Sequence, residues 1–245
     1  MVAIQVKDLT KIYTTGHLWW ATKIIALDHL NLHVFSHQVF GLLGLNGAGK
    51  TTLMKILLGL IPSTFGTAMV LGKPVNDIPT KHFIGYLPEM PYFPRYLTPY
   101  EILDFYGQLF NISLPERKQR IESSLEIVGL FGRKNSKLKE FSKGMLQRVG
   151  MAQLLINDPM ILFLDEPTFG LDPLAAKEMR DIILGLKKRG KTIFLNSHQI
   201  NEVERICDRI GILHEGKLIH AAIVKPHLEK FFVKVIRNAQ QNRNR

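Results

Sequence analysis

The 245-residue sequence predicts an α/β fold with a mixed, mostly parallel sheet and flanking helices. Apolar runs of strand length alternate with amphipathic helical patterns, which is typical of parallel strands covered on both faces. A continuous apolar run at 39–43 leads through glycine-rich sequence into a helical pattern starting at Gly49. That order indicates a buried strand, a tight loop and a helix. Strands of alternating polarity precede this core, and a mostly helical stretch interrupts it.

The N-terminal strands are predicted from alternation. Residues 4–6 and 30–34 alternate apolar and polar positions, as in a half-buried antiparallel sheet. The segment from His17 to Trp20 between them is expected to be a loop or hairpin tip. Two further short strands are expected at 67–71 and 83–87. Together these segments predict an N-terminal antiparallel β subdomain.

Helical patterns dominate from about residue 98 to residue 157, with stop signals at Pro115 and around 129–132. We expect a helical subdomain inserted here into a single domain that covers residues 1–235. The basic tail at 236–245 has little apolar content and is expected to be disordered. The core should resume after the insert as strand 160–164, helix 174–188, strand 192–195, helix 200–207 and strand 210–213.

Composition limits the classes of function. Hydrophobic residues make up 46% of the chain and charged residues 22%, which indicates a folded globular protein. The net charge of +11 suits nucleic acid, nucleotides or an anionic membrane surface. A solvated basic surface explains the charge equally well. The single cysteine, Cys207, excludes an intrachain disulfide and fits a reducing compartment.

Neither a signal peptide nor a transmembrane helix is expected. Lys7 and Lys11 interrupt any apolar run near the N-terminus. The most apolar stretch, 151–164, is broken by Asp158 and Pro159, whereas a membrane span needs roughly 20 apolar residues.

The most specific chemical signal is Gly-Leu-Asn-Gly-Ala-Gly-Lys-Thr-Thr at 44–52, a phosphate loop. Its glycines permit conformations that aim several backbone N–H groups at one anion, and the following helix adds its positive end. Lys50 can reach the β- and γ-phosphates, and the Thr51 hydroxyl can ligate Mg²⁺. The loop therefore predicts a P-loop nucleoside triphosphatase core. The predicted nucleotide contacts in it are Gly44, Asn46, Gly47, Ala48, Gly49, Lys50, Thr51 and Thr52.

Two carboxylates end the apolar strand at 160–164. Asp165 at the tip can reach the Mg²⁺ shell. Glu166 is one residue further, so it points toward the γ-phosphate side, where it can act as general base for the attacking water. A solvated Asp-Glu pair is the alternative, and the phosphate loop on the same predicted sheet argues against it.

The third motif is Phe-Ser-Lys-Gly-Met-Leu-Gln-Arg at 141–148, which we name the signature segment. Ser142 is a good N-cap residue, and a helix start beside Gly144 is an anion site. By local physics alone, an ordinary capped helix explains this segment at least as well.

These segments, in this order, resemble the nucleotide-binding subunit of ATP-binding-cassette (ABC) transporters, and the resemblance covers nearly the whole chain. The family usually has Leu-Ser-Gly-Gly-Gln where this chain has Phe-Ser-Lys-Gly-Met, a variant that resembles drug-, antibiotic- or polysaccharide-export subunits. The resemblance implies a head-to-tail homodimer that sandwiches two ATP molecules. Ser142 and Gly144 are retained at the positions that contact the γ-phosphate of ATP held by the other subunit.

Other family positions match residue by residue. Tyr13 occupies the place of an aromatic ring that stacks on adenine, although it could be a core tyrosine, and Trp19 or Trp20 could take the role. Asp172 matches the loop that crosses to the partner subunit. His198 matches a switch histidine whose imidazole can donate a hydrogen bond to the γ-phosphate.

One position departs from the family. Where the family has a loop glutamine, this chain has Glu89, which as an ionised carboxylate only accepts hydrogen bonds. Glu89 can still be a metal ligand, but unlike glutamine it has no N–H donor with which to position water. The residues that follow, 90–96, are rich in aromatic side chains. In relatives this region holds a helix of the membrane subunit; a hydrophobic seam within the domain is the alternative.

The resemblance implies an ATPase subunit that uses ATP and Mg²⁺ and powers transport, with export favoured, through a separate membrane-spanning permease. It would lie at the cytoplasmic face of the inner or plasma membrane, held there by the permease, and no nucleic-acid partner is expected. The alternative is a soluble ABC ATPase that acts on ribosomes or DNA, which the basic charge slightly favours. A kinase or GTPase would share only the phosphate loop, and the signature segment argues against it.

Overall fold

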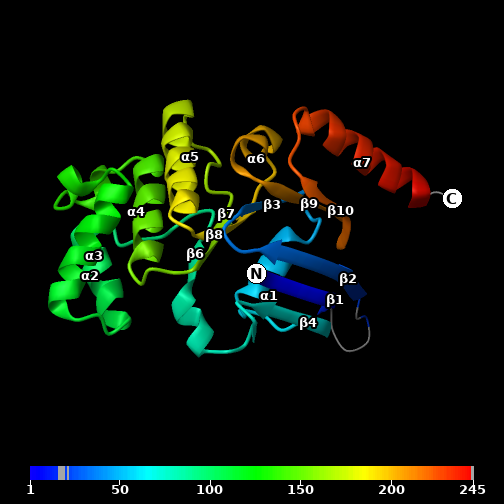
Figure 1. Cartoon of the computed structure of the whole chain (residues 1–245), viewed down its shortest axis with the longest axis horizontal. Helices are drawn as coiled ribbons and strands as arrows, with labels where there is room; N and C mark the ends of the chain where they lie inside the picture. The colour runs from blue at the N-terminus through cyan, green and yellow to red at the C-terminus, as the bar shows by residue number, and fades with distance from the viewer. Residues whose placement is uncertain (16–19, 21, 244–245) are drawn as a thin grey trace. The chain divides into compact units, whose positions relative to one another are not determined.

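The structure is a computed structural model that describes residues 1–15, 20 and 22–243 (Figure 1). The predicted tip from His17 to Trp20, and with it Trp19, lies outside the described residues except for Trp20 itself. The chain divides into two compact units. The first comprises Met1–Lys81 and Thr192–Arg245, and the second is His82–Lys191.

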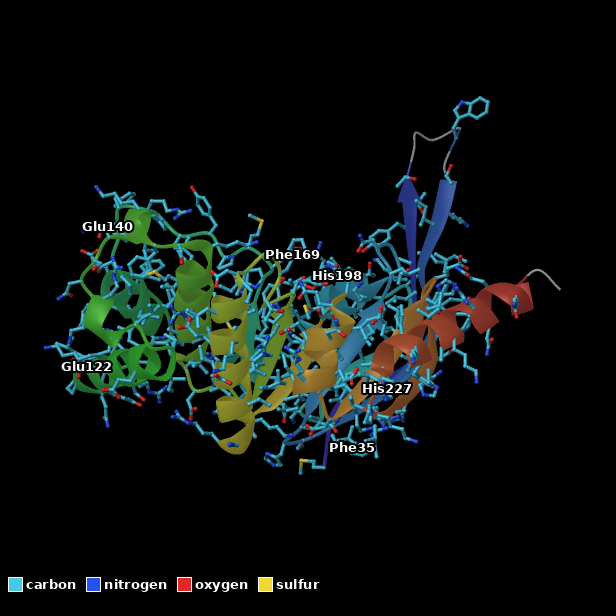
Figure 2. The ribbon with its side chains drawn as sticks, turned by 90° about the horizontal axis from the view of Figure 1, so that it is seen from above. Phe35, Glu122, Glu140, Phe169, His198 and His227 are labelled. Atoms are coloured by element: carbon cyan, nitrogen blue, oxygen red, sulfur yellow. The ribbon has the colours of Figure 1, made fainter. Side chains whose placement is uncertain are left out.

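The first unit contains the predicted antiparallel sheet. Its strand order is β2-β1-β4-β5. The strands are β1 (Val2–Thr15), β2 (Thr22–Phe35), β4 (Phe65–Val70) and β5 (Lys73–Pro74). Both β1 and β2 have 14 residues, far more than the alternating segments predicted. The hairpin that they form projects from the rest of this unit (Figure 2).

The first unit also holds strands β10-β9-β3-β8 in that order. Their bounds are β3 (Val39–Gly44), β8 (Thr192–Asn196), β9 (Arg209–His214) and β10 (Lys217–Ile223). Strand β3 pairs in parallel with both β8 and β9, and all six of its residues are buried, as its continuous apolar run predicted. The helices of this unit are α1 (Lys50–Leu57), α6 (Ile200–Ile206) and α7 (Leu228–Arg243).

Helix α7 corrects the prediction of a disordered tail at 236–245, because it continues to Arg243. Its apolar residues Leu228, Phe232 and Ile236 recur every four positions and are buried, so they hold the helix against the unit. The Glu204 carboxylate accepts hydrogen bonds from the backbone N–H groups of His227 and Leu228, which otherwise lack intrahelical partners.

The second unit contains the helices predicted at 98–157. Helix α2 (Pro99–Leu109) begins with a capping box in which Thr98 and Glu101 hydrogen-bond each other's backbone N–H. It is followed by α3 (Leu114–Ile127), two short 3-10 helices at Phe131–Arg133 and Leu138–Glu140, and α4 (Lys143–Leu155). That these helices form a separate inserted subdomain stays a prediction, because the compact unit that contains them, His82–Lys191, extends beyond residues 98–157 on both sides.

Two strands and one more helix complete the second unit. Strands β6 (Ile84–Leu87) and β7 (Ile161–Asp165) pair in parallel, and α5 (Pro173–Lys188) follows β7. A 3-10 helix at Pro79–Phe83 leads into β6. Within the described ranges, no helix is both long and apolar enough to cross a bilayer.

Candidate functional site

The phosphate loop lies between buried β3 and helix α1 in the first unit. Gly47 and Gly49 both have positive φ, +80° and +107°, which glycine adopts without steric cost. Gly49 is the N-cap of α1, so the loop delivers the free N–H groups of the helix start to one place. The Lys50 ammonium donates hydrogen bonds to the carbonyls of Gly44 (2.7 Å) and Leu45 (3.2 Å). The lysine therefore already lies over the loop that would hold phosphates.

The β1–β2 hairpin contacts this loop directly. Lys11 pairs with Leu27 and Ile12 with Ile25, so Ala26 is an extra residue, a β-bulge, in β2. A Cβ on Gly49 would lie only 2.4 Å from the carbonyl oxygen of Ala26. The hairpin backbone at the bulge is thus in van der Waals contact with the phosphate loop, and only glycine fits at Gly49.

Tyr13 lies further out on the same hairpin, opposite Ile24. Ile24 is two residues from Ala26, a distance of roughly 7 Å along a strand. The hairpin therefore places the backbone of Tyr13 close to the bulge that contacts the phosphate loop. Trp20 is 85% exposed. No contact of its side chain ties it to the loop within the described part of the chain.

His198 follows β8 and is exposed (labelled in Figure 2). Because β8 is parallel to β3, with Asn196 paired to Leu42, both strands end at the same edge of the sheet. The backbone N–H of Ser197 donates to the Leu42 carbonyl and fixes the start of the turn. His198 consequently emerges at the edge from which the phosphate loop departs.

In the second unit, Asp165 and Glu166 stand at the carboxyl end of β7, as predicted. Glu166 has φ +48°, a left-handed conformation that costs a non-glycine residue of order 1–2 kcal/mol. Burial and then the charge of Asp165 raise the pKa of Tyr86 on the neighbouring strand β6. Strained backbone of this kind gathers at functional sites.

Glu89 follows β6 by two residues and is exposed. Because β6 and β7 are parallel, Glu89 and Asp165 emerge at the same edge of this strand pair. The next residues expose large apolar surfaces, with Met90 72%, Tyr92 91% and Tyr96 71% exposed. Pro91 and Arg95 line a cavity of about 160 Å³. The start of α4 and the residue before its cap form another part of the lining, with Phe141, Lys143, Leu146 and Gln147.

The signature segment forms the start of α4, and Ser142 is its N-cap, as predicted. The Ser142 hydroxyl accepts a hydrogen bond from the Met145 N–H at 3.2 Å. Gly144 packs so closely on α5 that an added Cβ would lie 2.7 Å from the Cβ of Ala175. The Lys143 ammonium lies 5.2 Å from the centroid of the Phe169 ring. Packing against α5 therefore favours glycine at position 144.

Asp172 has a structural role that was not predicted, as the N-cap of α5. Its carboxylate caps α5 by accepting hydrogen bonds from the N–H groups of Leu174 (3.0 Å) and Ala175 (2.9 Å). Its predicted contact with a partner subunit stays a prediction.

The predicted residues thus fall into two sets. The first unit brings together the phosphate loop, Tyr13 and His198, and the second carries Glu89, Ser142, Gly144, Asp165, Glu166 and Asp172. Sequence reasoning missed the contact of Ala26 with the phosphate loop, because it depends on the bulge in β2.

A phosphate loop between a buried parallel strand and a helix defines a nucleotide-binding α/β protein. Residues 27–169 match the ABC transporter family, and the chain belongs to that family.

The relatives are ATP-binding proteins of transporters. An uncharacterized ABC transporter ATP-binding protein of Synechocystis sp. is 52% identical over 88% of this chain, which spans 61% of that relative's length. The bacitracin transport ATP-binding protein BcrA of Bacillus licheniformis is 41% identical over 93% of this chain and 71% of its own length. These relatives give no support to an action on ribosomes or DNA.

A solved structure agrees with the fold. An ATP-binding cassette captured as a dimer in a post-hydrolysis state, bound to ADP and phosphate, superposes with a TM-score of 0.79 at 26% identity. The match covers 91% of this chain and 99% of the other. The predicted P-loop core with its antiparallel β subdomain is therefore confirmed as the fold class.

Proposed function

We propose that this chain binds and hydrolyses ATP as one half of a dimeric motor and that it powers transport through a separate membrane-spanning permease. The proposal rests on two helix starts in one ABC-family chain whose backbone N–H groups can donate hydrogen bonds to an anion. One is the phosphate loop before α1, and the other is the signature start of α4.

The phosphate loop would hold the triphosphate. The backbone N–H groups of residues 44–52 surround the β- and γ-phosphates. The Lys50 ammonium exchanges its contacts with the Gly44 and Leu45 carbonyls for phosphate oxygens. Tyr13 stacks on adenine, a contact that contributes roughly 1–3 kcal/mol per base in nucleic-acid systems.

The available oxygen donors fit Mg²⁺. The described residues contain no cluster of three or more His, Cys, Asp or Glu side chains suited to a metal. Mg²⁺ is commonly held by one or two protein oxygens together with phosphate and water. The exposed Thr51 hydroxyl and the Asp165 carboxylate are such donors, and Glu89 is a third candidate. When bound, the ion would neutralise charge on the phosphates.

Glu166 would act as general base. Its carboxylate would accept a proton from the water that attacks the γ-phosphate. His198 would donate a hydrogen bond to the γ-phosphate from the edge of β8.

Dimerisation would complete each ATP site. Ser142 and Gly144 of one copy would face the γ-phosphate of ATP held by the other, with Asp172 as a further contact. Loss of the γ-phosphate then removes the bridge between the copies, and opening of the dimer transmits work to the permease. The dimeric cassette bound to ADP and phosphate supports this arrangement.

The permease would dock on the aromatic segment after β6. Met90, Tyr92 and Tyr96 offer exposed apolar surface in the second unit, as such docking requires. This contact would hold the chain at the cytoplasmic face of the membrane. The Phe-Ser-Lys-Gly-Met signature and the bacitracin relative favour export as the direction.

The test is steady-state ATP hydrolysis by the purified chain. Glu166→Gln should lower turnover by roughly 10²–10⁴-fold, the usual contribution of a positioned base, while ATP still binds. Lys50→Ala should weaken both binding and turnover. Wild-type turnover in Glu166→Gln would rule out the proposed base.

A further inference from the structure

We propose that Lys11 is a positioning residue for ATP, because its ammonium holds the Tyr13 ring in the orientation that stacks on adenine. The inference rests on the proposed function, in which Tyr13 contacts the base.

Lys11 and Tyr13 lie on one face of β1, since they are two residues apart on a strand. The Lys11 Nζ is 5.1 Å from the centroid of the Tyr13 ring, within the range of a cation–π contact. The same ammonium donates a hydrogen bond to the Pro62 carbonyl at 2.8 Å. The cation is therefore fixed at two points, and one face of the ring is occupied.

Pro62 belongs to the segment after α1, which is bound to β1 on both sides of Lys11. The Thr64 N–H donates to the Thr10 carbonyl, and the Ile12 N–H donates to the Thr64 hydroxyl oxygen at 3.0 Å. Lys11 thus ties the ring to the segment that follows the phosphate-loop helix.

The opposite strand gives a second connection to the phosphates. Lys11 and Ile12 flank the pairing position of the bulged residue Ala26, whose carbonyl abuts Gly49. Lys11 and Tyr13 therefore belong to the same hairpin that contacts the phosphate loop through Ala26. A ring held this way needs no reorientation when the base arrives, so binding loses less side-chain entropy.

The occupied face also has an electrostatic consequence. A cation draws electron density toward one face of an aromatic ring, and a base must then stack on the other face. Removing the charge should weaken only the part of the affinity that comes from the base.

The experiment measures binding by calorimetry in the Glu166→Gln variant of this chain, chosen to block turnover, with ATP and inorganic tripolyphosphate as probes. Lys11→Met keeps most of the side chain's length without its charge, and Lys11→Arg keeps the charge. Lys11→Met should weaken ATP binding about two- to fivefold, the value of an exposed cation–π contact. Tripolyphosphate binding should not change, which also reports that the variant is folded, and Lys11→Arg should bind ATP as the parent does.

A double-mutant cycle with Tyr13→Ala completes the test. If Lys11 acts through the ring, Lys11→Met has no further effect on ATP binding once Tyr13 is alanine. Additive effects, an equal loss of tripolyphosphate affinity, or unchanged ATP affinity in Lys11→Met would each overturn the inference. Failure of the parent to bind ATP at all would instead refute the proposed function, so the two failures are distinguishable.

Discussion

Replacing Gly49 with alanine tests how tightly the hairpin is held on the phosphate loop. The added Cβ would lie 2.4 Å from the Ala26 carbonyl oxygen, so the backbone must shift by about 0.6 Å to restore the 3.0 Å that real contacts keep. Overpacking of this kind costs about 1–3 kcal/mol. The positive φ of +107° adds roughly 1–2 kcal/mol for any residue with a Cβ.

Gly47→Ala is the matched control. Gly47 also has a positive φ, +80°, but a Cβ there meets nothing within 4 Å. It should therefore incur only the backbone cost of roughly 1–2 kcal/mol. The two variants should differ by about 1–3 kcal/mol, and each kcal/mol lowers the Tm of a chain this size by about 2–4 °C.

The assay is thermal unfolding of the nucleotide-free chain followed by circular dichroism. Gly49→Ala should unfold several degrees below Gly47→Ala. Equal unfolding temperatures would mean that the Ala26 carbonyl is not fixed against the phosphate loop.

Three further predictions concern single side chains. Ser142→Ala should destabilise the chain by about 0.5–2 kcal/mol through loss of the α4 cap. Ser142→Asp should keep the cap and the Tm but abolish ATP-driven dimerisation, because its carboxylate repels the γ-phosphate. Dimerisation of Ser142→Asp with ATP would contradict the proposed contact of Ser142 with the γ-phosphate. Tyr13→Ala should weaken ATP binding by roughly 1–3 kcal/mol while Tyr13→Phe keeps it; equal losses in equilibrium binding would exclude stacking. Glu89→Gln should raise the Mg²⁺ concentration needed for half-maximal hydrolysis, because a negative charge beside the ion is removed; an unchanged Mg²⁺ titration would place Glu89 away from the metal.

Several elements of the fold were predictable because their residues face one environment. Strand β3 is buried on both faces, so its apolar run is continuous. The start of α2 is written in the local sequence, because Thr98-Pro-Tyr-Glu101 is a capping box. Strand β10 was missed because it is a half-exposed edge strand without clear alternation. The polar end of α7 was mistaken for a disordered tail, since its stability comes from the buried face that begins at Leu228.

The candidate site shows the same division. Residue types and order were enough to predict the phosphate loop, the carboxylates and the Ser142 cap. The bulge at Ala26 depends on strand register, and the left-handed φ of Glu166 depends on the path of the chain after β7. Neither the bulge nor the left-handed φ follows from residue type, because a neighbouring residue of the segment could equally have been the bulged or left-handed one.

In the proposed motor, the phosphate loop of one copy and the signature segment of another bind the same ATP. Sedimentation velocity on Glu166→Gln, with and without ATP and Mg²⁺, measures whether ATP joins two copies. We expect a monomer without nucleotide and a dimer with ATP, and Ser142→Asp should prevent the dimer. A chain that binds ATP under these conditions but sediments as a monomer at every concentration, alone and with its permease, would contradict it.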